Sequence, residues 1–198
     1  MIQVQLLSLI LFPVLACAAD YQLCFLEDGL ESGKIEAARA KELQAAHMGH
    51  IGAMWKSGDL ESAGPISGLA GSRGIFILSA SASEAARLAS TDLKVLAGDL
   101  KINCQTWKGP ANIGKAYRET YGKPGFKETY VHRVGIVLKA ARPVAADLKL
   151  IASGPLRGGE YSFFAVLDTD DLPKVKNIFP EAKVFLWFHD AQVWNGVS

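Results

Sequence analysis

The first half of the chain combines strand-like hydrophobic runs with one long helix-like stretch. Residues 21–26 are apolar and aromatic and end at a polar turn, which predicts a strand. From Lys34 the composition shifts to residues that favour a helix, and Gly58 provides a stop signal. One face of this helix carries apolar residues and two histidines at helical spacing: Leu43, His47, His50, Ile51 and Met54. Both histidines should therefore point toward the core.

Shorter elements follow the helix. Residues 60–63 predict a short strand, and residues 75–78 predict a central strand that is covered on both faces. Ser81 and Glu84 have the spacing of a capping box, so a second helix should begin there, and residues 100–107 predict a last strand. The order β-α-β-β-α-β predicts an α+β, ferredoxin-like domain in which helices cover one face of the sheet.

The second half of the chain repeats part of this pattern. Residues 60–66, LESAGPI, have an echo in residues 150–156, LIASGPL, and similar strand and helix patterns follow both segments. Residues 140–147 are too short to repeat the long helix, and no histidine matches His47. We therefore expect a duplicated ferredoxin-like fold with a trimmed second copy. The chain would then close a barrel of the dimeric α/β-barrel type as an internal pseudo-dimer, with a homodimer as the alternative.

These patterns divide the chain into four parts. Residues 1–19 form an uncharged N-terminal segment, 20–108 the first domain, 109–128 a linker or arm, and 129–198 the degenerate repeat. The arm is basic and contains interleaved aromatic residues, a composition that also suits an anionic or nucleic-acid partner. We favour an arm that packs its tyrosines against the body and leaves its lysines in water.

The N-terminal segment has features of an export signal. The apolar run at residues 6–15 is too short to span a bilayer, and small residues follow it as they do before a signal-peptidase site. Cleavage after Ala18 or Ala19 would give an exported protein, periplasmic or secreted, with no stable membrane span. Cys17 lies in a weak lipoprotein box, so lipidation of Cys17 is a second hypothesis, and a buried strand or short anchor is a third.

Composition narrows the range of partners. A net charge of +1 provides no overall field for nucleic acid or anionic lipid, so we expect neither as a partner. Three cysteines are too few for a disulfide framework. Cys24 and Cys104 fall on the first and last strands of the predicted domain, which are neighbours in a ferredoxin-like sheet. A cross-strand disulfide is one hypothesis for an exported protein, but we favour free buried thiols because cross-strand geometry rarely suits the bond.

The candidate chemistry is a histidine–carboxylate pair. His47 lies on the inward face of the long helix, and the topology allows Asp92 to reach it. A carboxylate that binds one ring nitrogen fixes the tautomer and makes the other nitrogen a better base. The glycine-rich loop from Gly64 to Gly74 would bring backbone amides close to a ligand, and Arg73 within it suits a carboxylate or phenolate. The alternative is structural: a buried histidine with satisfied hydrogen bonds, and an aspartate that caps the next helix.

A metal site is a third interpretation of the same residues. His47 and His50 share a helix face, and Asp92 could complete a set of three ligands. The spacing is common by chance, so we expect no metal and no cofactor.

Residues 21–107 resemble the YCII-related (YciI-like) domain family. The resemblance is carried by six segments: the opening strand YQLCFL, the His47-x-x-His50 helix, Gly58-Asp59-Leu60, Ala63-Gly64-Pro65, Ser83-Glu84-Ala85, and Asp92 through Gly98. Leu93 stands where the family typically has a proline. The resemblance implies a ferredoxin-like dimeric α/β barrel, a small-molecule ligand, and His47 and Asp92 as the catalytic pair. We expect His50, Gly64, Pro65 and Arg73 to contact the substrate.

Two functions of different classes follow. The first is an exported enzyme that carries out lyase-type or isomerase-type proton transfer on a small organic molecule, with His47 as base or acid. The second is a non-catalytic binding or structural module that keeps the cavity. The lost histidine of the second half favours the module slightly.

Overall fold

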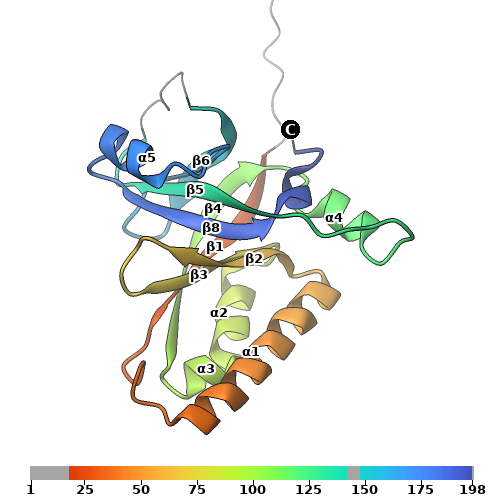
Figure 1. The fold of residues 1–198 in the computed structure, drawn as a ribbon, viewed down its shortest axis with the longest axis vertical. Helices are drawn as coiled ribbons and strands as arrows, with labels where there is room; N and C mark the ends of the chain where they lie inside the picture. Colours follow the sequence, from red (N-terminus) through yellow and green to blue (C-terminus); the bar gives the residue numbers. More distant parts are fainter. Residues whose placement is uncertain (1–17, 142–147, 198) are drawn as a thin grey trace, which may run out of the picture.

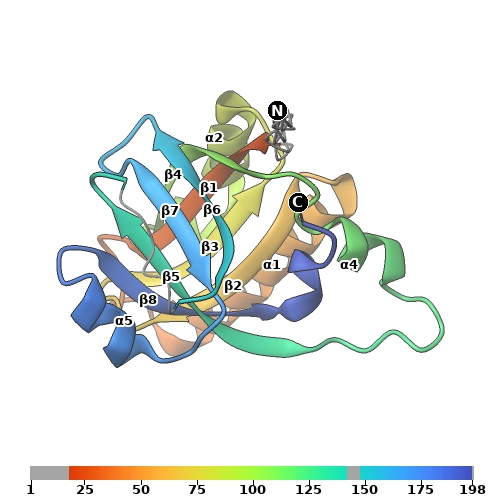
Figure 2. The same cartoon turned by 90° about the horizontal axis from the view of Figure 1, so that it is seen from above.

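The computed structural model describes residues 18–141 and 148–197, and its eight strands form a closed antiparallel barrel (Figures 1 and 2). Around the barrel the order is β1-β3-β2-β8-β5-β7-β6-β4. The strands are β1 (Ala18–Asp28), β2 (Leu60–Ser67), β3 (Ser72–Leu78), β4 (Leu100–Pro110), β5 (Tyr130–Leu138), β6 (Leu150–Arg157), β7 (Phe163–Leu167) and β8 (Lys183–Asp190). Most of the expected export signal, including Cys17, lies outside the described residues.

Helices cover parts of the outer wall of this barrel. They are α1 (Ala37–Ser57), α2 (Ala82–Thr91), α3 (Leu93–Leu96), α4 (Lys115–Thr120), α5 (Leu172–Ile178) and the 3-10 turn η1 (Ala191–Trp194). Figure 1 shows α1, α2 and α3 together on one side of the barrel and α5 on another, while α4 belongs to an arm that extends away from the body. Gly58 ends α1 with a φ of 90°, so the predicted stop signal is confirmed. No helix in the two described ranges has the length and apolar character needed to cross a bilayer.

The predicted fold class is wrong. We expected a ferredoxin-like α+β fold, duplicated as in a dimeric α/β barrel, but the strands form one closed antiparallel barrel with few helices. The face of the strands that points into the barrel carries a large hydrophobic cluster, and curling the sheet buries this face without a second layer. At the two seams between the halves of the chain, β2 pairs with β8 and β4 pairs with β6, which leaves no free sheet edge.

Three hydrophobic clusters hold this arrangement together. The barrel interior is filled from both halves of the chain, with Trp107, Phe164, Phe185 and Trp187 as its largest members. A second cluster lies on the outer wall, where Met54 of α1 packs among residues from the first-half strands. A third lies in the second half and includes α5.

The repeated Gly-Pro segments occupy equivalent places at the two seams. A Cβ atom on Gly64 would lie 1.9 Å from the carbonyl oxygen of Phe188, and one on Gly154 would lie 1.9 Å from that of Lys108. Each glycine therefore allows a β-strand of one half to approach a strand of the other. The weak sequence repeat thus corresponds to equivalent positions in the barrel.

Cys24 and Cys104 form a disulfide, so the favoured interpretation of free thiols is wrong. The two residues are direct partners in the β1–β4 ladder, and their Cα atoms lie 4.0 Å apart. The register places both side chains on the same face of the sheet, close enough for the bond. Cys24 is fully buried in the cluster on the outer wall.

Candidate active site

The structure brings His47 and Asp92 into direct contact. His47 lies on the buried face of α1 and is 6% exposed, and Asp92 lies fully buried between α2 and α3. The Nδ1 atom of His47 is 2.6 Å from Oδ2 of Asp92. The other carboxylate oxygen of Asp92 accepts a hydrogen bond from the amide of Lys94 at 2.8 Å, so Asp92 also caps α3. Asp92 therefore both caps α3 and pairs with His47.

The electrostatics of this pair define the tautomer of the histidine. Burial alone raises the pKa of Asp92, but the hydrogen bond and charge of His47 and the amide of Lys94 hold that pKa below its ordinary value. The ionised carboxylate can only accept hydrogen bonds, so Nδ1 of His47 must donate. In the neutral ring, Nε2 is then left as an acceptor. Phe76 stacks on the imidazole at 6.0 Å between ring centroids and fixes its orientation.

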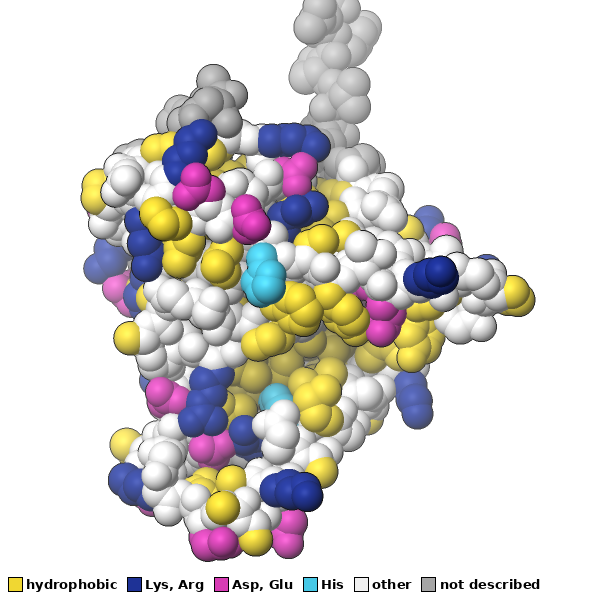
Figure 3. Space-filling model, in the orientation of Figure 1, with side chains coloured by type: hydrophobic (Ala, Val, Ile, Leu, Met, Phe, Trp, Pro, Cys, Tyr) yellow, Lys and Arg dark blue, Asp and Glu magenta, His cyan; other side chains and the backbone are white. Residues whose placement is uncertain are grey.

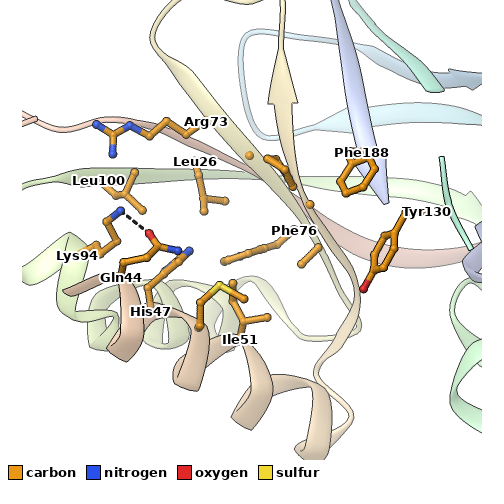
Figure 4. Close-up of a pocket in the computed structure, with 15 residues that line it drawn as sticks. Leu26, Gln44, His47, Ile51, Arg73, Phe76, Lys94, Leu100, Tyr130 and Phe188 are labelled. Atoms are coloured by element: carbon orange, nitrogen blue, oxygen red, sulfur yellow. Dashed lines mark hydrogen bonds between the residues drawn. The ribbon is translucent and has the colours of Figure 1, made fainter. Parts of the chain in front are cut away.

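His47 lines a cavity of about 580 Å³ between α1 and the outer wall of the barrel. Figure 3 shows this face of the molecule hollowed, with hydrophobic side chains gathered in the hollow. Figure 4 shows Arg73 and Lys94 at one end of the cavity and Tyr130 and Phe188 at the other, with His47 between them. The lining residues are Leu26, Gln44, His47, Met48, Ile51, Ala63, Gly64, Pro65, Arg73, Gly74, Phe76, Lys94, Leu100, Tyr130 and Phe188. The cavity therefore has one polar end and a mostly apolar body.

The cations at the polar end already have anionic partners. Arg73 donates from Nε to Asp28 at 2.6 Å, and its Nη1 lies 3.3 Å from the carboxylate of Asp99. Lys94 Nζ lies 3.0 Å from the same carboxylate and donates to Gln44 at 3.0 Å. These contacts use two of the three donors of the Lys94 ammonium, so one remains for a ligand.

The structure places most of the other expected site residues at the cavity and one outside it. Gly64, Pro65 and Arg73 line the cavity together with His47. They belong to the paired strands β2 and β3, so the expected loop from Gly64 to Gly74 is wrong. His50 does not: its Nε2 lies 3.1 Å from the carbonyl oxygen of Leu88, which directs the ring toward α2. Within the two described ranges, no three histidine, cysteine or acidic side chains are grouped to hold a metal ion.

Sequence reasoning missed several residues of the cavity. Lys94 is 8% exposed although lysines are normally solvated, and it enters the site because it follows Asp92 by two positions in the same turn. Tyr130 and Phe188 come from β5 and β8, which the β2–β8 seam brings beside the first half of the chain. The sequence repeat marks Gly64 at this seam but does not show which strand of the second half pairs there.

No protein-family model matches the chain, and no match is found among curated proteins or solved structures. The resemblance to the YCII-related family remains an expectation from the sequence. The geometry of the cavity is therefore the guide to function.

Proposed function

We propose that this protein is an enzyme that transfers a proton on a small organic molecule bound beside His47. The observation that carries the proposal is the buried His47–Asp92 pair at the wall of a cavity of about 580 Å³. Among the described residues no hydrogen-bond partner occupies Nε2 of His47, so this atom can accept a proton from a ligand. Cavities of this size suit small molecules.

Each residue then has a defined task. His47 acts as the general base through Nε2, and the adjacent carboxylate of Asp92 stabilises the imidazolium that forms. The free donor of Lys94 can stabilise negative charge that develops on a substrate oxygen at the polar end. Phe76, Tyr130 and Phe188 provide an apolar wall for a ring or hydrocarbon body.

Hydrogen–deuterium exchange at carbon tests this proposal before the natural substrate is identified. A panel of small cyclic ketones, keto acids and lactones is incubated with the protein in deuterated buffer and followed by proton NMR. We expect exchange α to a carbonyl for at least one compound, and its loss in His47→Gln. Equal exchange with wild type and His47→Gln would contradict the proposal.

A non-catalytic small-molecule-binding module is the second candidate. It is favoured by the ion pairs of Arg73 and Lys94, because groups neutralised by carboxylates bind a ligand without polarising it strongly. Saturation-transfer NMR on the same panel separates the two candidates. Compounds that bind in the cavity without exchanging deuterium would support the module.

We also propose that the protein is exported. The Cys24–Cys104 disulfide supports this, because such bonds persist mainly in oxidising compartments. Mass spectrometry of protein from its native envelope should show a chain that begins after Ala18 or Ala19. An intact Met1, or a lipid on Cys17, would contradict cleavage at these positions.

A further inference from the structure

Gln44 lines the cavity but has no task in the proton transfer described above. It lies on α1, three positions before His47. Its side-chain oxygen, Oε1, accepts a hydrogen bond of 3.0 Å from Nζ of Lys94 (Figure 4). Residues three positions apart share a face of a helix, so the amide of Gln44 and the imidazole of His47 are neighbours at the cavity.

The hydrogen bond to Lys94 fixes the orientation of the Gln44 amide. A lysine ammonium only donates hydrogen bonds, so the amide atom that faces Lys94 must be the oxygen. The amide nitrogen, Nε2, is therefore the atom left to the cavity. Its two N–H groups have no acceptor within residues 18–141 and 148–197.

The amide of Gln44 and the ammonium of Lys94 can donate to one ligand oxygen. Both polar atoms of an amide are attached to the same carbon, and Oε1 of Gln44 lies 3.0 Å from Nζ of Lys94. Nε2 is therefore close to Nζ, which keeps one donor of its own. Lys94 is 8% exposed, and a hydrogen bond in such a shielded place is stronger than the same bond in water.

The charged groups at this end of the cavity suit an oxygen that gains charge during a reaction. Lys94 and Arg73 line the cavity, and no acidic residue of the described ranges does. The carboxylates of Asp28 and Asp99 pair with these cations from outside the lining. Two carboxylates balance two cations, so the end carries little net charge but presents positive groups. Such a surface favours an oxygen that is neutral when bound and becomes negative in the transition state.

The spacing along α1 suits a carbonyl compound. Side chains three positions apart on a helix have Cβ atoms about 5–6 Å apart. In a carbonyl compound, one carbon atom separates the oxygen from the α-carbon. A substrate whose oxygen binds Gln44 can therefore present its α-proton to Nε2 of His47, one turn further along the helix.

We propose that Gln44 and Lys94 form an oxyanion site and that the substrate is a small enolisable carbonyl compound. The inference rests on the proposed proton transfer and names the substrate class for it. His47 takes the α-proton at Nε2, the C–H electron pair forms a carbon–carbon double bond, and the carbonyl π electrons move to the oxygen. Gln44 and Lys94 donate to that oxygen as it becomes negative. Return of the proton to carbon restores the neutral imidazole.

Binding of 4-nitrophenolate tests the oxyanion site without turnover, because a phenolate resembles an enolate in charge and shape. The compound is titrated into the full chain at a pH where the phenol is ionised, and the side-chain amides are followed by nitrogen–proton NMR. We expect a saturable shift of the NH₂ signals of Gln44. The NH₂ group of Gln105 already donates to the carbonyl oxygen of Tyr161 and should not shift. The neutral isostere nitrobenzene should bind at least about tenfold more weakly.

Matched variants assign the effect to the amide. Gln44→Met keeps an unbranched side chain of similar length at an exposed helix position and removes both N–H donors, so 4-nitrophenolate should bind about tenfold more weakly. Lys41→Met removes a positive charge from an exposed position on the same helix, outside the cavity, and should leave binding unchanged. Equal binding of 4-nitrophenolate and nitrobenzene, no shift at Gln44, or equal effects of the two variants would overturn the inference.

The exchange assay separates failure of this inference from failure of the proposed function. For a compound that exchanges its α-hydrogen, Gln44→Met should lower kcat at least about tenfold, because the lost donor acts as charge develops on the oxygen. Equal kcat in wild type and Gln44→Met would overturn the oxyanion site and leave the proton transfer standing. Binding of 4-nitrophenolate that depends on Gln44, without exchange of any compound, would support the site and contradict the proton transfer.

Discussion

The disulfide allows a quantitative prediction about stability. Cys24 and Cys104 are separated by 80 positions, and a cross-link that closes a loop of that length removes entropy worth about 4.5 kcal/mol at 25 °C from the unfolded chain. Small domains have total stabilities of roughly 5–15 kcal/mol, so this bond supplies a large share of the total. Reduction should therefore bring the protein close to unfolding.

The assay is urea-induced unfolding of the chain from Ala18 onward, followed by tryptophan fluorescence with and without reductant. Reduced wild type keeps both sulfur atoms in the core, so its difference from the oxidised protein isolates the cross-link. The Cys24→Ala/Cys104→Ala variant should unfold at the same urea concentration with or without reductant. This variant should be slightly less stable to urea than reduced wild type, because the buried sulfur atom of Cys24 is lost.

Two results would refute this reasoning. One is a free energy of unfolding that changes by less than about 1 kcal/mol on reduction, far below the loop-closure value. The other is the titration of two free thiols in unreduced, denatured protein of the same chain. Either result would mean that the β1–β4 pairing does not carry a covalent link.

Two further predictions concern the barrel. Gly64→Ala should destabilise the fold by about 3 kcal/mol or more in urea unfolding, since the new methyl group would lie 1.9 Å from the carbonyl oxygen of Phe188. Gly49→Ala, in α1 with open space around it, should instead stabilise the protein by about 1 kcal/mol, and equal effects of the two substitutions would contradict the close approach at the seam. Burial lowers the pKa of His189 from 6.5 to about 4. Between pH 6.5 and pH 4, the unfolded chain therefore binds a proton at His189 and the folded chain does not. Stability should fall by about 3 kcal/mol as the pH drops from 6.5 to 4, and His189→Gln should lose this histidine contribution.

Local elements of the structure could be predicted because their signals are local. The long helix, its glycine stop and the inward position of His47 follow from spacing along one segment. The predicted start of the second helix is confirmed, because the Ser81 hydroxyl accepts a hydrogen bond from the amide of Glu84. The Glu84 carboxylate pairs with Arg87, so only the serine half of the capping box is present. The contact of His47 with Asp92 was predicted from the order of neighbouring elements together with the resemblance to the YCII-related family.

The strand pairs at the two seams of the barrel could not be predicted in the same way. The pairs Ile66–Trp187 and Trp107–Leu156 join residues far apart in the chain, and no periodicity encodes their register. The same limitation hid Tyr130 from the list of cavity residues, since it reaches the site only through these long-range pairings. The disulfide was not predicted because cross-strand disulfides are rare in general. The sequence alone does not show that Cys24 and Cys104 are direct partners in the β1–β4 ladder.

The proposed proton transfer requires that Asp92 fix His47 as a base that faces the cavity. Nitrogen-15 NMR of the imidazole, at a pH where the ring is neutral, tests it directly in wild type and in Asp92→Asn. Asparagine keeps an oxygen that can cap α3, so the variant changes the partner of His47 more than the fold. We predict a protonated Nδ1 and an unprotonated Nε2 in wild type, and a shift toward protonated Nε2 in the variant. A wild-type ring protonated at Nε2, or a tautomer that ignores the substitution, would contradict the account.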